Sequence, residues 1–346
     1  MRLLILTQKI DENDDVLGFM HGWVKEFARQ AERVTVICLY KGEYHLPENV
    51  QVFSLGKERG ESRLKYIWNF YKYISREQKN YDAVFVHMNQ EYVLLGGLVW
   101  KILGKKIIMW RNHGAGNFLT RLAVMFCDKV LCTSKFSYTA KFKKTSLMPV
   151  GIDTKLFEAD PTITRKTKSI LFLARMSPVK RPDFLLAALR ILNDQCLDFR
   201  AFFYGDPKLE DIKYYENLKE QVVREKLTEK VSFEKAVANS QTPKIYSAFE
   251  ILVNLSPSGM LDKTVFEGIA CGILPLVSSP VFDDIIPPEF RIKENNVGNL
   301  AEKIKSVFSL SETSVTQHRA NYRQMIEKNH SLIHLTSKIL KLCFQS

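Results

Sequence analysis

Two short segments of the sequence hold residues whose types and spacing could do chemistry, and the first of them is basic. Arg175 follows a predicted strand over residues 169–174, and Lys180 precedes a predicted helix that begins at Pro182. Cations at the end of a strand and ahead of a helix are typical of an anion site, because charge-assisted donors and the helix dipole act on one ligand. A solvated basic turn has the same composition, so this segment alone leaves both interpretations open.

The second segment is a loop containing Ser and Gly, over residues 256–263, which follows a predicted strand over 251–255. Its backbone N–H groups suit phosphate or hydroxyl oxygens. Asp262 is a candidate N-cap of the next helix, and Glu267 falls in the second turn of that helix. A carboxylate there cannot serve a phosphate but can accept hydrogen bonds from a ribose diol. Taken alone, Glu267 is better explained as a surface residue of an amphipathic helix.

A histidine in the first half is the third candidate. His113 lies in Trp-Arg-Asn-His-Gly (110–114), directly after a predicted strand over 106–110. A lone His is more often structural, but one at a strand end ahead of a Gly turn is a candidate for ligand contact. Asp14 and Asp15, after the first predicted strand, could bind an acceptor or cap the next helix, and capping is the favoured role.

Several familiar site motifs are absent from the sequence. There is no Gly-x-x-x-x-Gly-Lys-Ser/Thr loop for phosphates, no His-Glu-x-x-His, no Cys-x-x-Cys and no Asp-x-Asp pair. The single Gly-x-Gly, at 114–116, does not open the first strand–helix unit, so a dinucleotide site is disfavoured. The sequence therefore predicts no resident metal ion and no bound cofactor.

Composition limits the class of protein. The chain has 346 residues, of which 46% are hydrophobic and 25% charged, as is typical of a globular protein. Its six cysteines are sparse and lie mostly in apolar runs, as reduced, buried residues of a cytoplasmic protein do. The N-terminal apolar run is too short for a signal peptide, and the most apolar segment, 92–110, is interrupted by lysines. We therefore expect a cytoplasmic protein without a membrane span.

The net charge of +12 is distributed unevenly along the chain. Residues 1–155 carry 24 Lys and Arg against 15 Asp and Glu, whereas residues 156–346 carry 26 against 23. The excess in the first half indicates either an acidic partner, such as nucleic acid, anionic lipid or a phosphorylated substrate, or a solubilising surface. Its densest part is a predicted helix with interleaved aromatic residues, whose cations are Arg63, Lys65, Lys72, Arg76 and Lys79.

Short apolar runs alternate with amphipathic segments along the whole chain. The predicted strands are 3–6, 34–39, 83–87, 106–110, 130–133 and 146–150, followed by 169–174, 199–204, 231–233, 251–255 and 274–277. Helices predicted between them favour parallel sheets, hence an α/β protein with two doubly wound, Rossmann-like domains facing a cleft. We expect an N-terminal domain over 1–155, a C-terminal domain over 156–330, and a terminal helix at about 331–346 that packs back onto the first domain.

Together these segments resemble the retaining glycosyltransferases of family 4, which have the GT-B fold. The resemblance covers nearly the whole chain and rests on the order and spacing of its markers. The markers are Pro-Val-Gly-Ile-Asp (149–153), the pair Arg175 and Lys180, Tyr-Gly-Asp (204–206), Val-Ser-Phe (231–233) and the run from Phe266 to Pro275.

The resemblance implies roles for individual residues. Arg175 and Lys180 would bind the donor diphosphate, Glu267 the ribose, and His113 the donor sugar near its anomeric carbon. His113, Arg175 and Lys180 are thus the predicted catalytic residues. The predicted donor-binding residues are Gly18, Arg175, Lys180, Gly205, Gly259, Met260, Leu261, Asp262, Lys263 and Glu267.

The sequence departs from the family pattern in the donor loop, at Lys235, where a Gly is common, and in the N-terminal loop. The family usually has a Glu eight residues before the position of Glu267, where it contacts the donor sugar, and this sequence has Gly259. The loop would then hold the sugar through backbone N–H groups, Asp262 or Lys263. Of the Gly pair typical of the N-terminal loop, only Gly18 is present.

The favoured interpretation is an enzyme that transfers a sugar, with retention and without metal, from a UDP or GDP type donor to a hydroxyl acceptor in polysaccharide or glycolipid biosynthesis. Many members of the family glycosylate lipid-linked acceptors at the cytoplasmic face. We therefore expect a lipid-linked acceptor and peripheral contact with the anionic inner membrane surface. The alternatives are a nucleotide-sugar epimerase and a basic nucleic-acid-binding protein. No nucleic acid is expected as a partner, because no recognition motif accompanies the charge.

Overall fold

The computed structural model describes residues 1–346 except 15, 258, 260 and 345–346, and it divides into two compact units. Unit 1 comprises Met1–Asp153, Ala238–Ser240 and His330–Ser346. Unit 2 comprises Thr154–Val237 and Gln241–Asn329. The last described helix therefore belongs to the same unit as the first strand.

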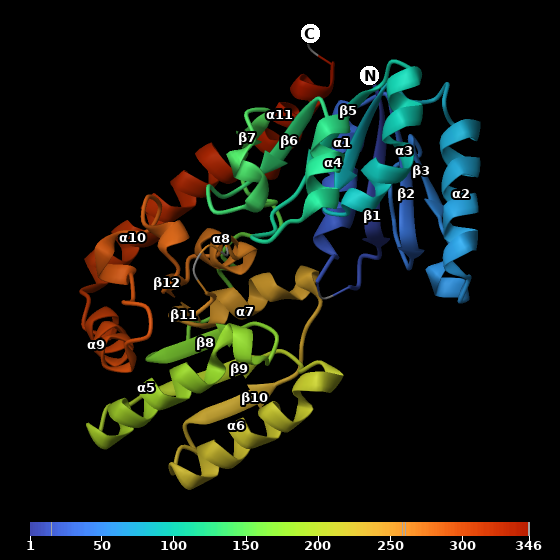
Figure 1. The fold of residues 1–346 in the computed structure, drawn as a ribbon. Helices are drawn as coiled ribbons and strands as arrows, with labels where there is room; N and C mark the ends of the chain where they lie inside the picture. The colour runs from blue at the N-terminus through green and yellow to red at the C-terminus, as the bar shows by residue number, and fades with distance from the viewer. Residues whose placement is uncertain (15, 258, 260, 345–346) are drawn as a thin grey trace. The chain divides into compact units, whose positions relative to one another are not determined.

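Unit 1 is built, in its described residues, on a parallel sheet of seven strands in the order β3-β2-β1-β4-β5-β6-β7 (Figure 1). The strands are β1 (Arg2–Ile10), β2 (Arg33–Lys41), β3 (Val50–Ser54), β4 (Ala83–His87), β5 (Lys106–Trp110), β6 (Lys129–Cys132) and β7 (Thr145–Leu147). Leu3 of β1 lies opposite both Val34 of β2 and Ala83 of β4. The chain runs outward from β1 to β3 and then returns to the other side of β1, so the strand order reverses between β1 and β4.

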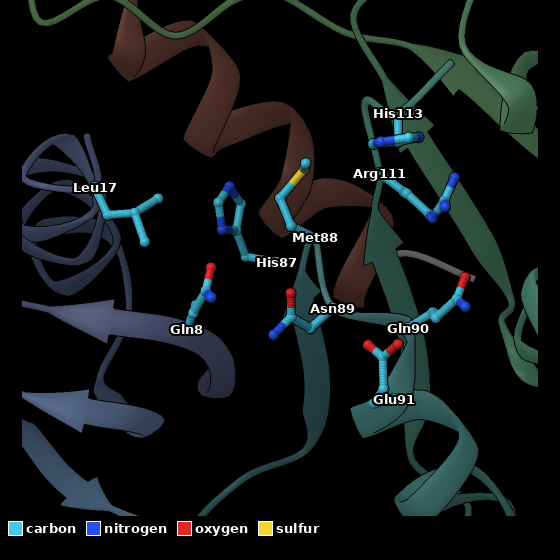
Figure 2. Close-up of a pocket in the computed structure, with 9 residues that line it drawn as sticks. All are labelled: Gln8, Leu17, His87, Met88, Asn89, Gln90, Glu91, Arg111 and His113. Atoms are coloured by element: carbon cyan, nitrogen blue, oxygen red, sulfur yellow. The ribbon is translucent and has the colours of Figure 1, made fainter. Parts of the chain in front are cut away.

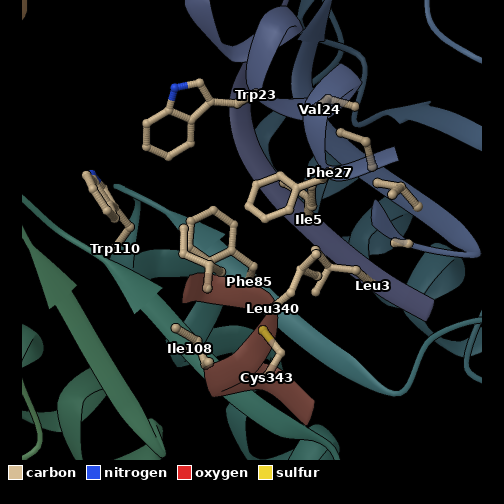
Figure 3. Packing of buried hydrophobic residues seen from close by; sticks show 14 of the residues in the cluster. Leu3, Ile5, Trp23, Val24, Phe27, Phe85, Ile108, Trp110, Leu340 and Cys343 are labelled. Carbon is tan, nitrogen blue, oxygen red and sulfur yellow. The ribbon is translucent and has the colours of Figure 1, made fainter. Parts of the chain in front are cut away.

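One face of this sheet is covered by α1 (Phe19–Gln30) together with α11 (Leu332–Phe344), which come from distant parts of the chain. Figure 3 shows Phe27 of α1 and Leu340 of α11 beside Phe85 of β4. All three side chains are buried, so helices more than 300 residues apart share one core with the sheet.

The opposite face is covered by α2 (Arg63–Arg76), α3 (Gln90–Ile102) and α4 (Phe118–Phe126). Strand residues of the other parity, such as Leu4 and Val84, are buried there. Because both faces are covered, the central strands are apolar at nearly every residue rather than at alternate residues.

Unit 2 contains a parallel sheet that has, among its described residues, five strands in the order β10-β9-β8-β11-β12. Its strands are β8 (Ser169–Leu173), β9 (Arg200–Tyr204), β10 (Val231–Glu234), β11 (Ile251–Asn254) and β12 (Leu274–Val277). Its α-helices are α5 (Pro182–Asp194), α6 (Ile212–Arg224), α7 (Thr242–Ala248), α8 (Lys263–Ala270), α9 (Val297–Phe308) and α10 (Glu312–Met325). The order reverses between β8 and β11, so both units are doubly wound, as the alternation of strands and helices predicts.

Each predicted strand corresponds to a strand of the structure. Strand β3 is not predicted from the sequence. This strand lies at the edge of the unit 1 sheet, and only its last residue, Ser54, is fully buried. An edge strand pairs on one side and is partly solvated, so its apolar pattern is weak.

The burial of the cysteines and the apolar character of the helices are the two features expected from composition. All six cysteines are free and five are buried, but Cys196 is exposed, contrary to the prediction. Cys196 has a φ of 55° in the turn after α5, where no element covers it. None of the helices in the described part of the chain combines the length and the apolar character needed to cross a bilayer.

Gly151, in the junction motif 149–153, occupies a position that only glycine fits. Its φ is +79°, a left-handed conformation, and its N–H donates to the carbonyl oxygen of His330 at 3.0 Å. A Cβ atom here would overlap the side chain of Leu335 in α11 and lie 3.1 Å from Cζ2 of Trp23 in α1. Gly151 therefore allows the backbone to pass directly against both helices.

We expect Gly151→Ala to lower the free energy of unfolding of unit 1 by about 1–3 kcal/mol, because strain at a positive φ adds to overpacking. Gly22→Ala is the matched control, since Gly22 lies inside α1 with no atom within 4 Å of its Cβ position. There Ala should stabilise the helix by about 0.5–1 kcal/mol. All 4 tryptophans belong to unit 1, so urea unfolding followed by Trp fluorescence measures both effects. Equal stability of the two variants would contradict this account.

Candidate active site

The predicted site residues of unit 2 gather at one edge of its sheet. Arg175 and Lys180 follow β8, and Asp262 follows β11, the direct neighbour of β8. The strand order reverses between these two strands, and open parallel sheets bind ligands at the carboxyl ends on either side of such a reversal. The fold thus brings residues from separate parts of the sequence to one place.

Lys180 and Asp262 are in direct contact at this edge. The Lys180 ammonium lies 2.5 Å from Oδ2 of Asp262 and donates to Oγ of Ser256 at 3.0 Å. The same carboxylate oxygen accepts hydrogen bonds from Nδ2 of Asn254 at 2.9 Å and from Oγ of Ser256. Burial by itself would raise the pKa of Asp262, but the ammonium and the hydrogen bonds hold that pKa below its ordinary value. The carboxylate is therefore ionised at neutral pH.

Asp262 does not cap α8 with its side chain, contrary to the prediction. It occupies the N-cap position, but its side chain makes no hydrogen bond to the helix backbone. Donors from Lys180, Asn254 and Ser256 compete for the carboxylate and hold it away from the helix. An ion pair outweighs a cap here, because charged partners strengthen a hydrogen bond.

Arg175 is an exposed cation at the same edge. Its side chain makes no hydrogen bond or ion pair with any residue that the structure describes. The backbone on either side is fixed, because Ala174 N–H donates to the carbonyl oxygen of Tyr204 at 3.1 Å and Met176 N–H to that of Asp206 at 3.2 Å. A guanidinium without a counter-ion on a fixed backbone is available to an anionic ligand.

Glu267 is buried inside α8, so the interpretation as a surface residue is wrong. Its side chain is 4% exposed, with Oε1 3.7 Å from the Lys263 ammonium. The Tyr246 hydroxyl donates to Oε2 at 3.4 Å. Burial first, and then this carboxylate, raise the pKa of Tyr246 well above its ordinary value, so that its hydroxyl stays protonated and can donate.

Three buried hydroxyls close to this edge have no hydrogen-bond partner among the described residues, namely those of Thr264, Ser278 and Ser279. Ser278 and Ser279 follow β12, and Ser278 N–H donates to the carbonyl oxygen of Asn254 at 3.2 Å. Buried polar groups are normally paired. These hydroxyls are therefore available to a polar group from outside the described chain.

The other predicted donor-binding residues of unit 2 lie in the loops that follow β9 and β11. Gly205 is buried, and its N–H already donates to the carbonyl oxygen of Glu234 at 3.1 Å. Gly259 has a φ of 86°, and Leu261 is half-buried. Met260 is outside the described residues.

Unit 1 has a pocket of its own where β1 and β4 meet (Figure 2). Its volume is about 280 Å³, and it is lined by Gln8, Leu17, His87, Met88, Asn89, Gln90, Glu91, Arg111 and His113. Gln8 lies within the last three residues of β1, and the other lining residues follow β1, end or follow β4, follow β5, or begin α3. The pocket therefore occupies the strand-order reversal of its sheet, as the Asp262 network does in unit 2. Its size is at the lower end for small-molecule sites, which span about 300–1,000 Å³.

A strained turn at the end of β4 shapes this pocket. Asn89 N–H donates to the carbonyl oxygen of His87 at 2.8 Å, and Met88 between them has a φ of 65°. Such a conformation costs on the order of 1–3 kcal/mol in a residue other than glycine and is concentrated at ligand sites. Figure 2 shows Gln8, His87 and Asn89 next to one another in the pocket. The Asn89 side chain forms a hydrogen bond with the Tyr92 hydroxyl, whereas the side-chain amide of Gln8 makes no hydrogen bond within the described chain.

His113 and Arg111 form another part of the same pocket. Nδ1 of His113 lies 3.0 Å from both the backbone nitrogen and the carbonyl oxygen of Ala115, which leaves Nε2 for a ligand. Nη2 of Arg111 donates to the carbonyl oxygen of Ala115 at 3.0 Å, whereas its Nη1 is buried without a partner among the described residues. Burial lowers the pKa of Arg111, and the nearby charge of Glu91 opposes that effect.

The N-terminal loop lies beside the pocket through Leu17. Gly18 is the residue before α1, and its N–H donates to the carbonyl oxygen of Asp14 at 3.1 Å. The Asp14 carboxylate accepts from the N–H groups of Val16 and Leu17 and pairs with Lys9, so it caps the turn that leads into the helix. Asp15 is outside the described residues.

Comparison with known families decides the class of protein. The family described as glycosyl transferases group 1 matches residues 153–328, about half of the chain. This chain belongs to the glycosyl transferases group 1. The resemblance inferred from the sequence is confirmed at that level, while membership of family 4 and the retaining mechanism stay predictions.

Solved structures similar to this glycosyltransferase share its fold at low sequence identity. Anabaena HepE in complex with UDP has a TM-score of 0.79 and 17% identity over 99% of each chain. Sucrose-phosphate synthase from Thermosynechococcus elongatus has a TM-score of 0.74 and 13% identity over 99% of this chain and 98% of its own. WaaG, a glycosyltransferase involved in lipopolysaccharide biosynthesis, has a TM-score of 0.69 and 14% identity over 99% of this chain and 100% of its own. A search of curated proteins found no match.

The fold of the glycosyltransferase is therefore GT-B, with two Rossmann-like domains. Of the lining residues of the unit 1 pocket, sequence analysis names only His113. Gln8, His87, Asn89 and Glu91 are missed, although they follow or end predicted strands whose ends meet at the strand-order reversal. The rule that selects Arg175 also applies to these residues, because ligands bind at the carboxyl ends of parallel strands.

Proposed function

We propose that this glycosyltransferase is a retaining member of family 4 that transfers a sugar from a nucleotide-diphosphate donor to a hydroxyl acceptor. The observation that carries the proposal is the exposed Arg175 at the strand-order reversal of unit 2. This guanidinium has no counter-ion among the described residues and lies on the same loop as Lys180. A diphosphate is the anion of every nucleotide-diphosphate sugar, and paired cations are suited to bind it.

The donor would be held by groups from two loops of unit 2. Arg175 and Lys180 would bind the diphosphate, and the ammonium of Lys180 keeps one N–H beyond those directed at Asp262 and Ser256. Glu267 would accept hydrogen bonds from the ribose, which requires it to exchange the contact with Lys263 or Tyr246 for the diol. A UDP donor is favoured over GDP, because HepE binds UDP.

The chemical step would be driven mainly by electrostatics. The bond between the anomeric carbon and the diphosphate breaks with both electrons moving to the diphosphate, while the acceptor oxygen bonds to that carbon and loses its proton. The departing diphosphate is the base formed in the same step. Preorganised cations stabilise its growing charge, and Arg175 and Lys180 are the groups available for this.

The acceptor would enter the pocket of unit 1. The side-chain amides of Gln8 and Asn89 and the carboxylate of Glu91 suit hydroxyl groups. His113 would approach the donor sugar through Nε2, the nitrogen that Ala115 leaves open. The involvement of WaaG in lipopolysaccharide biosynthesis supports an acceptor in polysaccharide or glycolipid assembly.

We further propose that the first domain contacts an anionic membrane from the cytoplasm, through α2 and its neighbour α3. Leu64, Trp68 and Tyr71 of α2 are 79%, 54% and 40% exposed, while Ile102 of α3 is 76% exposed. The cations of Lys65 and Lys72 lie over the Trp68 ring, at 4.4 and 5.0 Å from its centroid. The Tyr71 hydroxyl donates to the carbonyl oxygen of Leu95 at 2.9 Å, so the two helices are adjacent. Exposed aromatic and aliphatic residues flanked by cations are typical of an interfacial helix.

Removing either cation of the diphosphate site should abolish most activity without unfolding the protein. We expect Arg175→Ala and Lys180→Ala each to lower kcat/KM by about 30- to 1,000-fold, since one preorganised charge contact contributes on the order of 2–4 kcal/mol to the transition state. The measurement is release of UDP or GDP from UDP-glucose and GDP-mannose. Arg190→Ala, which removes an exposed cation of α5, is the control and should keep wild-type rates. Near-normal turnover in both site variants would refute the assignment.

Turnover should not depend on an added metal ion. The reason is the pair of cations at the strand end, which would supply the positive charge that a bound divalent ion provides in other transferases. Initial rates in excess EDTA should equal those without chelator within experimental error. A requirement for Mg²⁺ or Mn²⁺ that restores activity after chelation would show that this part of the proposal is wrong.

Binding to anionic vesicles should be reversible and sensitive to salt. Neutralising Arg63, Lys65, Lys72 and Arg76 together should weaken co-sedimentation with phosphatidylglycerol vesicles by 10-fold or more, because each cation contributes about 1 kcal/mol at such a surface. Affinity for UDP should be unchanged. The matched control neutralises four exposed cations of unit 2, namely Lys213, Lys219, Arg224 and Lys226. If the wild type ignores these vesicles at low ionic strength, a non-membrane acceptor becomes the better proposal.

A further inference from the structure

The loop after β11 lacks the Glu that would contact the donor sugar, and its backbone explains why. Gly259 stands at that position with a φ of 86°. A Glu in this left-handed conformation would be strained, so restoring the family residue here would distort the loop. A contact to the sugar would therefore come from backbone N–H groups of the loop or from another side chain.

Asp262, three residues later, presents one carboxylate oxygen that is not used. Every donor on this side chain bonds to Oδ2, and Oδ1 has no hydrogen bond from the part of the chain that the structure describes. The side chain is 19% exposed. An ionised carboxylate oxygen can accept more than one hydrogen bond, so Oδ1 is an open acceptor next to Lys180.

The groups that hold Asp262 are themselves buried. Asn254 is 4% exposed and Ser256 is 1% exposed, and both donate to Oδ2. Burying a polar group lowers the stability of the folded protein unless the group is paired. A network that fixes Oδ2 and leaves Oδ1 unpaired therefore does not reach the stability that full pairing would give. Such an arrangement is expected where a carboxylate must be kept in one orientation for a ligand.

Unpaired hydroxyl groups at the same edge are an independent observation. The buried hydroxyls of Ser278 and Ser279, which are 8% and 2% exposed, are unpaired within the described residues. Ser278 is joined to Asn254 by a backbone hydrogen bond of 3.2 Å, so it lies beside the residue that holds Asp262. A ligand with several hydroxyl groups would satisfy both features.

We propose that Oδ1 of Asp262 accepts a hydrogen bond from a hydroxyl of the donor sugar and so replaces the missing Glu as a specificity-determining residue. The inference rests on the proposed function, because a nucleotide sugar must bind in unit 2. Lys180 connects the two ends of the donor: its ammonium would bind the diphosphate and already binds Asp262, so a sugar attached to that diphosphate lies within reach of Oδ1. A donor that lacks the contacted hydroxyl would leave the carboxylate unpaired and be rejected.

The test compares wild type and Asp262→Ala with UDP-glucose and its monodeoxy analogues, or with GDP-mannose and its analogues if that is the donor consumed. One analogue should lower the wild-type kcat/KM by about 10- to 100-fold, as expected for the loss of a hydrogen bond to a charged group. Asp262→Ala should lose a similar factor with the parent donor and nothing further with that analogue. Asp262→Asn keeps the shape of the side chain. It should also distinguish the analogue from the parent donor less well than the wild type does, but by a smaller factor than Asp262→Ala.

Controls separate the direct contact from a structural effect. Calorimetric titration with UDP reports on folding and on the diphosphate site, and each Asp262 variant should still bind UDP. Because Asp262 orients Lys180, the UDP affinity of a variant can differ from that of the wild type, but this difference cancels when the parent donor and its analogue are compared on the same variant. Asp183→Ala changes an exposed carboxylate of α5 that accepts a hydrogen bond from the Tyr214 hydroxyl, and its response to the deoxy analogues should match the wild type. If Asp262→Ala loses as much kcat/KM as the wild type does when the parent donor is replaced by each analogue, the assignment is overturned. Failure of the wild type to consume any UDP or GDP sugar would overturn the proposed function itself, and this inference with it.

Discussion

The reversal of strand order beside β1 and β8 is the constraint on which both candidate sites depend. Crossovers between parallel strands are right-handed, so winding in the two directions puts helices on opposite faces of the sheet. At the reversal the loops after two adjacent strands diverge, and the carboxyl ends between them stay uncovered. In unit 1 this point holds the pocket of His87, Asn89 and Gln8, and in unit 2 it holds the network of Lys180 and Asp262.

Charge at the edge of unit 2 is divided between a paired and an unpaired cation. Lys180 is oriented by Asp262 and Ser256, whereas Arg175 has a fixed backbone and a side chain without a partner among the described residues. The paired cation is preorganised and its position is defined, while the unpaired one keeps its full charge for a ligand. A site that combined two unpaired cations would carry more charge but less order, and electrostatic stabilisation depends on both.

Much of the fold follows from the sequence, because strands covered on both faces are continuous apolar runs. The strands at 83–87, 106–110 and 274–277 are predicted to the residue, whereas β3, at the half-solvated edge, has no such run. For the site, residue type and strand ends suffice to select Arg175 and Lys180 as neighbours of one another. They do not suffice for Asp262: local rules assign it a cap, and only the pairing of β8 with β11 brings Lys180 to its carboxylate. The pocket of unit 1 is not predicted for the same reason, because its lining depends on which strands are neighbours in the sheet.

The position of α11 in unit 1 has a consequence for synthesis on the ribosome. The face of the sheet formed by β1, β4 and β5 is covered by α1 from the start, but α11 is made only after the whole of unit 2. At 5–20 residues per second, translation of the chain between Asp153 and Phe344 takes about 10–40 s. For that interval the apolar surface that Leu335, Ile339 and Leu340 later cover is exposed on the nascent chain. The first domain to be translated is therefore the one whose core is completed by the last segment of the chain.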